Sequence, residues 1–224
     1  TVAWSHQRIA GRTTLANLWI LSPARRGRTR LGKARRSLSQ VAGATDVIAA
    51  AIPQRIPGVL LNDVGPELNL TGIERIAAYV GQPVVYRDWD EAIGDLRARH
   101  GEIHPRYGDA EWQRYVRRVC KQTGRGVEFD YDLRIAEPFA AANAGEGPDG
   151  WPFYRALTGR PVLVIRGEHS DLLPAEALAR MASEIPDVEV VTVPDVGHAP
   201  DLGEPESIAA IDRLLERVLN RDRA

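Results

Sequence analysis

The last third of the chain alternates between two hydrophobic patterns. Residues 161–165 and 188–193 are short runs dominated by β-branched apolar side chains, which favours buried strands. Residues 174–185 and 204–219 instead repeat apolar positions every three to four residues, which predicts amphipathic helices. A strand–helix–strand–helix order with continuously apolar strands is typical of a parallel sheet that helices cover on both faces.

The middle of the chain has a different character. Residues 59–64 predict one more buried strand, which Gly65 and Pro66 close. The segments with helical spacing are 47–55, 70–80, 88–100, 109–122 and 151–157. We expect Thr71 to cap the second of these helices and Gly81 to end it. The Gly-rich stretch 141–150 predicts a loop.

Two polar side chains follow the predicted strands of the last third. Asp171 lies in the segment Arg166-Gly-Glu-His-Ser-Asp171, just after the first strand, and His198 follows the second. Reactive groups of parallel sheets lie beyond the carboxyl ends of the strands. A carboxylate beside a histidine fixes the tautomer of the imidazole and stabilises the imidazolium, so the two residues predict the acid and the base of a nucleophilic triad. His169, in the same loop as Asp171, is a weaker candidate for the histidine of the triad.

Composition narrows the function. With 224 residues, 44% of them hydrophobic, 26% charged and a net charge of -1, the chain has the composition of a globular protein with no general attraction to nucleic acid. The single cysteine, Cys120, excludes an intrachain disulfide and a thiolate metal cluster, and no histidines have metal-ligand spacing. No apolar run reaches the roughly 18 residues of a membrane span. We therefore expect a cytoplasmic protein without metal, cofactor, nucleic-acid partner or membrane partner.

The charge is distributed unevenly. Residues 1–45 contain no acidic side chain and many arginines, so a boundary lies near Asp46. The basic segment 1–46 is open to three interpretations: a phosphate-binding arm, an unstructured tail, or a stretch translated out of frame.

Together these segments resemble the α/β-hydrolase family. The resemblance rests on residues 49–66, on Arg160 to Asp171, on Gly197-His-Ala-Pro200 and on the last helix. It implies an α/β fold, namely a partial doubly wound, mostly parallel sheet with a helical lid. The hydrolase core would comprise residues 47–66 and 151–224, and the lid residues 67–150. The family's order of nucleophile, acid and histidine implies that Asp171 and His198 are the triad acid and base.

The resemblance also implies a nucleophile. Counting one helix back from the Pro53 turn leads to Ser39, with Ser37 as the alternative, and the backbone N–H of Gln40 would contribute to an oxyanion hole. The family's Gly-x-Ser-x-Gly elbow is replaced by Ser37-Leu-Ser-Gln-Val41, which lacks both glycines. Before Ser39 only residues 18–21 are a candidate strand. The chain is therefore expected to be truncated or frame-disrupted at its start, with an open sheet edge that favours a homodimer.

The predicted function is that of a serine hydrolase acting on an ester-like or related carbonyl substrate. Ser39 would attack, His198 would transfer the proton and Asp171 would orient His198. Large aromatic side chains would line an apolar pocket for a small molecule, or simply pack between lid and core: Trp89, Trp112, Trp151, Phe153 and Tyr154. The alternatives are a catalytically incomplete, hydrolase-like protein, and haloperoxidase-like or C–C-cleaving chemistry on the same fold.

Overall fold

A computed structural model describes residues 18–21, 57–133, 136 and 149–221, with side chains from residue 57 onward. The strands are β1 (Leu18–Leu21), β2 (Gly58–Asn62), β3 (Val85–Tyr86), β4 (Cys120–Gln122), β5 (Val127–Phe129), β6 (Val162–Gly167) and β7 (Val188–Val193). The helices are α2 (Leu70–Ala77), α3 (Trp89–His100), α4 (Asp109–Val119), α6 (Trp151–Arg155), α7 (Ala175–Glu184) and α8 (Pro205–Arg221). None of these described helices has both the length and the apolar character to cross a bilayer. The predicted helix 47–55, most of the predicted loop 141–150, Ser37, Ser39 and Gln40 lie outside the described residues.

The main sheet has the strand order β1-β2-β6-β7, and its three later strands are parallel. Every residue of β2 and of β6 is buried, as expected for strands covered on both faces. The prediction of a mostly parallel sheet is confirmed. Residues 18–21 form β1, which pairs antiparallel with β2 and is the end strand of the described sheet on that side.

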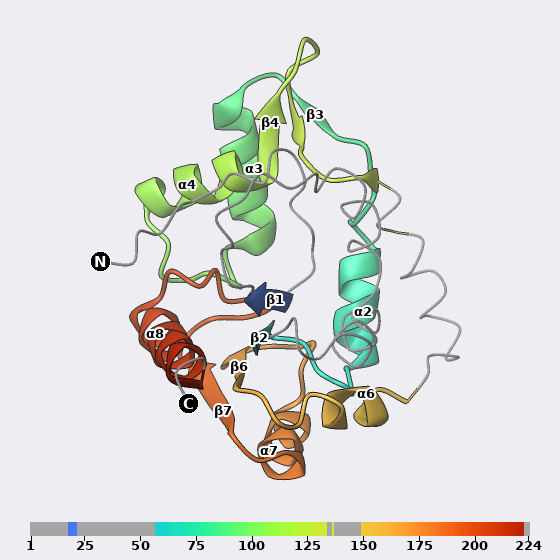
Figure 1. Ribbon diagram of the computed structural model, residues 1–224. Coiled ribbons are helices and arrows are strands. Elements are labelled where there is room, and N and C mark those ends of the chain that lie inside the picture. The colour runs from blue at the N-terminus through green and yellow to red at the C-terminus, as the bar shows by residue number, and fades with distance from the viewer. Residues whose placement is uncertain (1–17, 22–56, 134–135, 137–148, 222–224) are drawn as a thin grey trace, which may run out of the picture.

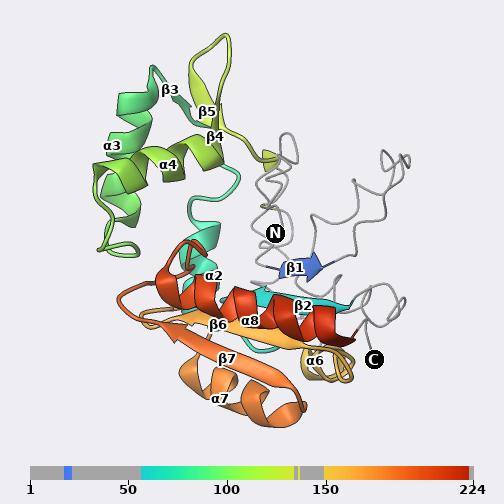
Figure 2. The same cartoon turned by 60° about the vertical axis from the view of Figure 1, so that its left-hand side comes forward.

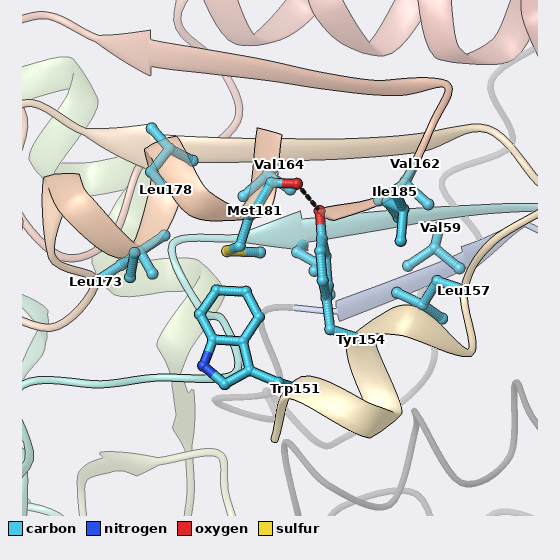
Figure 3. Packing of buried hydrophobic residues seen from close by; sticks show 12 residues of the cluster. Val59, Trp151, Tyr154, Leu157, Val162, Val164, Leu173, Leu178, Met181 and Ile185 are labelled. Carbon is cyan, nitrogen blue, oxygen red and sulfur yellow. Dashed lines mark hydrogen bonds between the residues drawn. The ribbon is translucent and has the colours of Figure 1, made fainter. Parts of the chain in front are cut away.

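Helices cover both faces of this sheet (Figure 2). Along β6, Val162 and Val164 face a cluster with α6 and α7, whereas Leu163 and Ile165 face a cluster with α8. In the first cluster the Tyr154 hydroxyl donates a 2.9 Å hydrogen bond to a backbone carbonyl of α7 (Figure 3). Alternate side chains of β6 point to opposite faces of the sheet, so this one strand packs against both helical layers.

Part of the segment between β2 and β6, from β3 to β5, forms a second unit with its own core. Here α3 and α4 pack on a small sheet of order β3-β5-β4, at a distance from the main sheet (Figure 1). The predicted helices 88–100 and 109–122 are confirmed, except that the second helix ends at Val119 and the chain continues as β4. These strands have only two or three residues, too few for a recognisable alternation.

Helix α2 connects the two units. Its cap is Asn69, whose side chain accepts a 3.1 Å hydrogen bond from the backbone of Thr71, so the expectation of Thr71 as the cap was wrong by two residues. The helix packs closely on the loop after β6: a Cβ added to Gly72 would lie 2.6 Å from the carbonyl oxygen of Asp171. Only a residue without a side chain fits at this crossing.

Two helical glycines offer a matched test of this contact. Gly72→Ala should lower the free energy of unfolding, because the new methyl group meets backbone atoms that cannot move aside cheaply. Gly94→Ala in α3 should raise it by about 0.5–1 kcal/mol, since nothing lies within 4 Å of the added carbon and alanine favours helix. Urea denaturation measures both changes. Equal stabilisation by the two substitutions would contradict the close packing at Gly72.

Two histidines are buried in the second unit. His100 ends α3, and His104 stacks on Tyr107 with the ring centroids 4.4 Å apart. Desolvation by burial is the main reason why the pKa of each histidine falls to about 4. Both histidines are therefore neutral in the folded protein near neutral pH.

These pKa values predict acid sensitivity. In the unfolded chain a histidine has a pKa of about 6.5, so on acidification the unfolded state binds protons before the folded state does. The free energy of unfolding is then unaffected above about pH 6.5 and falls toward pH 4, by up to about 3 kcal/mol per histidine. His104→Phe, which keeps the ring stacking, should reduce the slope measured by urea denaturation between about pH 6.5 and 4.5. His169→Gln, at an exposed position, should leave this slope unchanged. Equal slopes in the wild-type protein, His104→Phe and His169→Gln would refute His104 as a source of the acid sensitivity.

Candidate active site

The carboxyl ends of the three parallel strands place polar groups at one edge of the main sheet. Asp63 directly follows β2, Gly167 ends β6, and His198 lies in the loop after β7. Because β6 lies between β2 and β7, Asp63 and His198 approach each other across the end of β6.

Asp63 and His198 form a buried pair. His198 Nδ1 lies 2.8 Å from Asp63 Oδ2, and the side chains are 6% and 0% exposed, respectively. Since an ionised carboxylate only accepts hydrogen bonds, Nδ1 carries the proton and donates a hydrogen bond to Asp63 Oδ2. Nε2 is then the basic nitrogen of the ring. A base held in a fixed orientation and tautomer can take a proton from a nucleophile.

The Asp63 carboxylate is held by further contacts. Its Oδ1 accepts a 3.2 Å hydrogen bond from the backbone N–H of Gly167, and its own backbone N–H donates to the carbonyl of Ile165. The backbone of Asp63 has φ = 58°, in the left-handed region that non-glycine residues adopt infrequently. A residue in this conformation with a fully buried carboxylate depends on such contacts, because an unpaired buried charge is strongly disfavoured.

The loop that carries His198 packs directly on its neighbours. A Cβ added to Gly167 would lie 2.5 Å from the carbonyl oxygen of Val196, so a glycine is needed for the loop to cross the end of β6. The side chain of Asn62 donates a buried 2.9 Å hydrogen bond to the carbonyl of Pro200, two residues after His198. Consecutive residues at the end of β2, Asn62 and Asp63, therefore both hold this loop.

The structure gives Asp171 a different partner, Arg75. Both of its carboxylate oxygens accept hydrogen bonds from the guanidinium of Arg75 in α2, one of them at 2.7 Å from an Arg75 terminal nitrogen. These hydrogen bonds hold the pKa of Asp171 below its usual value. The predicted pairing of Asp171 with His198 is therefore corrected: the carboxylate that contacts His198 is Asp63.

The loop geometry accounts for this difference. The buried guanidinium of Arg166 donates to three carbonyls of the loop after β6: to Leu173 at 2.7 Å, to Glu168 at 3.0 Å and to Ser170 at 3.2 Å. The loop curls around this guanidinium and presents Asp171 to α2. Asp63 is the first residue after β2, so its carboxylate lies directly at the end of the sheet.

Asp63 could have been found by the rule that was applied to Asp171. It directly follows an apolar run, Val59 to Leu61 with Asn62, and its strand joins the same parallel sheet. The pattern predicts a strand that continues to Val64, so it assigns Asp63 to the strand itself, whereas β2 ends at Asn62 and Asp63 begins the loop. A carboxylate immediately after a buried parallel strand is itself a site signal.

His169, the weaker candidate among the histidines, lies on the surface. His169 is exposed, and with Glu168 and Asp195 it forms the group of described residues that could hold a metal ion, its ligand atoms lying within 4.8 Å of one another. All three are exposed, and Asp195 already pairs with Arg106.

The aromatic side chains expected at a pocket mainly pack. Trp151 and Tyr154 belong to the main core beneath α7, and Trp112 lies in the second unit at 5.1 Å from the ring of Tyr107. Trp89 lies under the guanidinium of Arg117. These contacts favour the packing interpretation for those four side chains.

Comparison with known proteins places this geometry in a family. The model of the alpha/beta hydrolase family matches residues 10–211. The match extends well before residue 47, into the basic segment that carried no resemblance by its motifs.

Individual relatives agree with the family match. A 3-hydroxybutyrate-oligomer hydrolase of Cupriavidus necator is 39% identical over 67% of this chain and 54% of its own length. A 2-(acetamidomethylene)succinate hydrolase of Mesorhizobium japonicum is 28% identical over 75% of this chain and 58% of its own. The crystal structure of an alpha/beta hydrolase from Novosphingobium aromaticivorans aligns with a TM-score of 0.70 and 50% identity, over 77% of this chain and 61% of that one.

This chain thus spans somewhat more than half the length of these curated relatives. The parallel sheet, the buried pair at its carboxyl edge and the matched residues 10–211 lead to one conclusion. The chain belongs to the alpha/beta hydrolase family.

Proposed function

We propose that this protein hydrolyses carboxylic esters of small organic acids by nucleophilic catalysis, with His198 as the base and Asp63 as the carboxylate that orients it. The observation that carries the proposal is the buried 2.8 Å contact between His198 Nδ1 and Asp63 Oδ2. It fixes the tautomer in which Nε2 accepts a proton, as acyl transfer by a hydroxyl nucleophile requires.

Support for an ester substrate comes from the relatives. The 3-hydroxybutyrate-oligomer hydrolase, 39% identical to this chain, is named for hydrolysing oligomers of a small hydroxy acid. We therefore take as substrate class the short esters of hydroxy acids, in which a carbonyl carbon is attacked and an alcohol leaves.

Ser39 is the proposed nucleophile. Its hydroxyl would attack the ester carbon while His198 Nε2 takes the proton, and the proton would then pass to the departing alcohol. Water would cleave the acyl-enzyme in the same manner. The N–H of Gln40 would stabilise the oxyanion of each tetrahedral intermediate.

We also propose that residues 67–150 act as the lid. The support is their place in the chain and their contacts: they are inserted between β2 and β6, and they touch the loops after β6 and β7. A cover of this kind would exclude water from the reacting groups.

The nucleophile can be tested by covalent labelling. A fluorophosphonate probe should label the wild-type protein, and Ser39→Ala should abolish the labelling, because the probe reacts only with an activated hydroxyl. Ser37→Ala is the matched control, two residues away, and should retain it. Labelling that follows Ser37 would move the nucleophile to that residue, and a folded protein without any labelling would indicate a catalytically incomplete hydrolase.

The two carboxylates can be separated by amide substitutions. Asp63→Asn should lower kcat for a short ester by about 10⁴-fold, because the amide no longer fixes the His198 tautomer. Asp171→Asn should leave kcat within about tenfold, since Asp171 contacts Arg75 instead. Steady-state kinetics of both variants decide between the acids, and the reverse order of effects would restore Asp171 as the triad acid.

A further inference from the structure

One short turn of the proposed lid makes several hydrogen bonds to the loop that carries His198. This turn, residues 101–108, joins α3 to α4 and is called the clamp turn here. The backbone N–H of Gly197, the residue before His198, donates a 2.8 Å hydrogen bond to the carbonyl of Ile103. The clamp turn thus reaches the immediate neighbour of the catalytic base.

Two side chains of the clamp turn contact the His198 loop on either side of the histidine. Arg106 donates to Asp195 Oδ2 at 2.9 Å, three residues before His198. The Tyr107 hydroxyl donates to Asp201 Oδ2 at 2.6 Å, three residues after it. The contacts flank His198 symmetrically, so they restrain the loop against both rotation and displacement.

The backbone of the His198 loop needs such restraint. Asp195 has φ = 54° and Leu202 has φ = 66°, so non-glycine residues adopt the left-handed conformation near both ends of the loop. Residues in sparsely populated conformations persist only where their surroundings hold them. The contacts of the clamp turn lie at one of these residues, Asp195, and directly beside the other, at Asp201.

The ring of Tyr107 packs against two buried aromatic side chains of the second unit. Its ring stacks on buried His104 with an interplanar angle of 4°, and it packs edge to face with the ring of buried Trp112, the two centroids lying 5.1 Å apart. Burial and the hydrogen bond to Asp201 raise the pKa of Tyr107, so the hydroxyl remains a donor. Tyr107 therefore transmits the position of the α3–α4 unit to the His198 loop.

We propose that Tyr107, supported by Arg106, is a positioning residue for His198, through which the lid keeps the imidazole on Asp63. This inference rests on the proposed function in that it takes His198 as the base. In this arrangement the lid serves catalysis by fixing the geometry of the base as well as by covering the site. A displacement of the α3–α4 unit loosens the base.

The chain offers a closely matched control for the hydroxyl. The ring of Tyr86 is buried in the core of the same unit, and its hydroxyl also donates to a carboxylate, that of Asp95, at 2.6 Å. Among the described residues Tyr86 has no hydrogen bond to the His198 loop. Tyr107→Phe should lower kcat for a short ester by about 10- to 100-fold and leave KM within about twofold, because a base displaced by a fraction of an ångström loses rate but not binding. Tyr86→Phe should change neither constant. Arg106→Gln should have a smaller effect on kcat than Tyr107→Phe, and Arg99→Gln none.

A second measurement does not depend on hydrolysis. The Nδ1 proton shared with Asp63 should give a far-downfield ¹H NMR signal in the wild-type protein, identified by its loss in Asp63→Asn. We expect Tyr107→Phe to broaden this signal or remove it, and Tyr86→Phe to retain it. Circular dichroism melts show whether each variant is folded, and Arg106→Gln provides the test if Tyr107→Phe does not fold.

The outcomes separate the two proposals. If the wild-type protein cleaves no ester but the NMR signal weakens only in the clamp-turn variants, the proposed function fails and the positioning role stands. If the signal and kcat are the same in Tyr107→Phe, in Arg106→Gln and in the controls, the positioning role is overturned while the proposed function stands. Equal losses in Tyr107→Phe and Tyr86→Phe would indicate a general loss of stability and would also overturn it.

Discussion

The burial of the Asp63 carboxylate is the constraint on which the rest of the site depends. A fully buried carboxylate is tolerated only if donors surround it, and here the donors are His198 Nδ1 and the Gly167 N–H. Gly167 is the last residue of β6, His198 lies in the loop after β7 and Asp63 follows β2, so the sheet must bring three strand ends together. The same requirement accounts for the glycine at position 167, where the His198 loop crosses.

The pair is held from two sides that differ in their chemistry. On the inner side, residues at the end of β2 fix the loop through short buried hydrogen bonds, as Asn62 does with Pro200. On the outer side, the clamp turn holds the loop through the backbone hydrogen bond between Gly197 and Ile103 and through two partly exposed side-chain contacts. Buried contacts of this kind open only with the sheet itself, whereas the exposed ones can open locally. The core thus defines the geometry of the base, and the inserted unit can modulate it.

The sequence predicted those parts of the fold that produce long, regular patterns. The strands β6 and β7, the helices that follow them and His198 were all recognisable, because a continuous apolar run followed by an amphipathic stretch has few alternatives. The strands β3, β4 and β5 were missed, because they are too short for any periodicity. The partner of His198 was mispredicted for a different reason. The prediction took the acid from the loop after β6, the strand before β7 in sequence and its neighbour in the sheet. The acid instead follows β2, which lies on the other side of β6. Which carboxylate faces a histidine depends on loop conformation, and Arg166 determines that conformation through hydrogen bonds that no linear pattern reveals.

The second carboxylate at this edge has its own structural role. Asp171 and Asp63 both lie beyond the carboxyl ends of parallel strands, and two anions facing one imidazole would compete for it. Arg75 removes this competition, because its guanidinium engages both oxygens of Asp171. The ion pair also links α2 to the loop after β6, at the point where Gly72 permits a close approach. Charge neutralisation at Asp171 and docking of the inserted segment are therefore one interaction, and Asp63 remains the carboxylate that contacts the base.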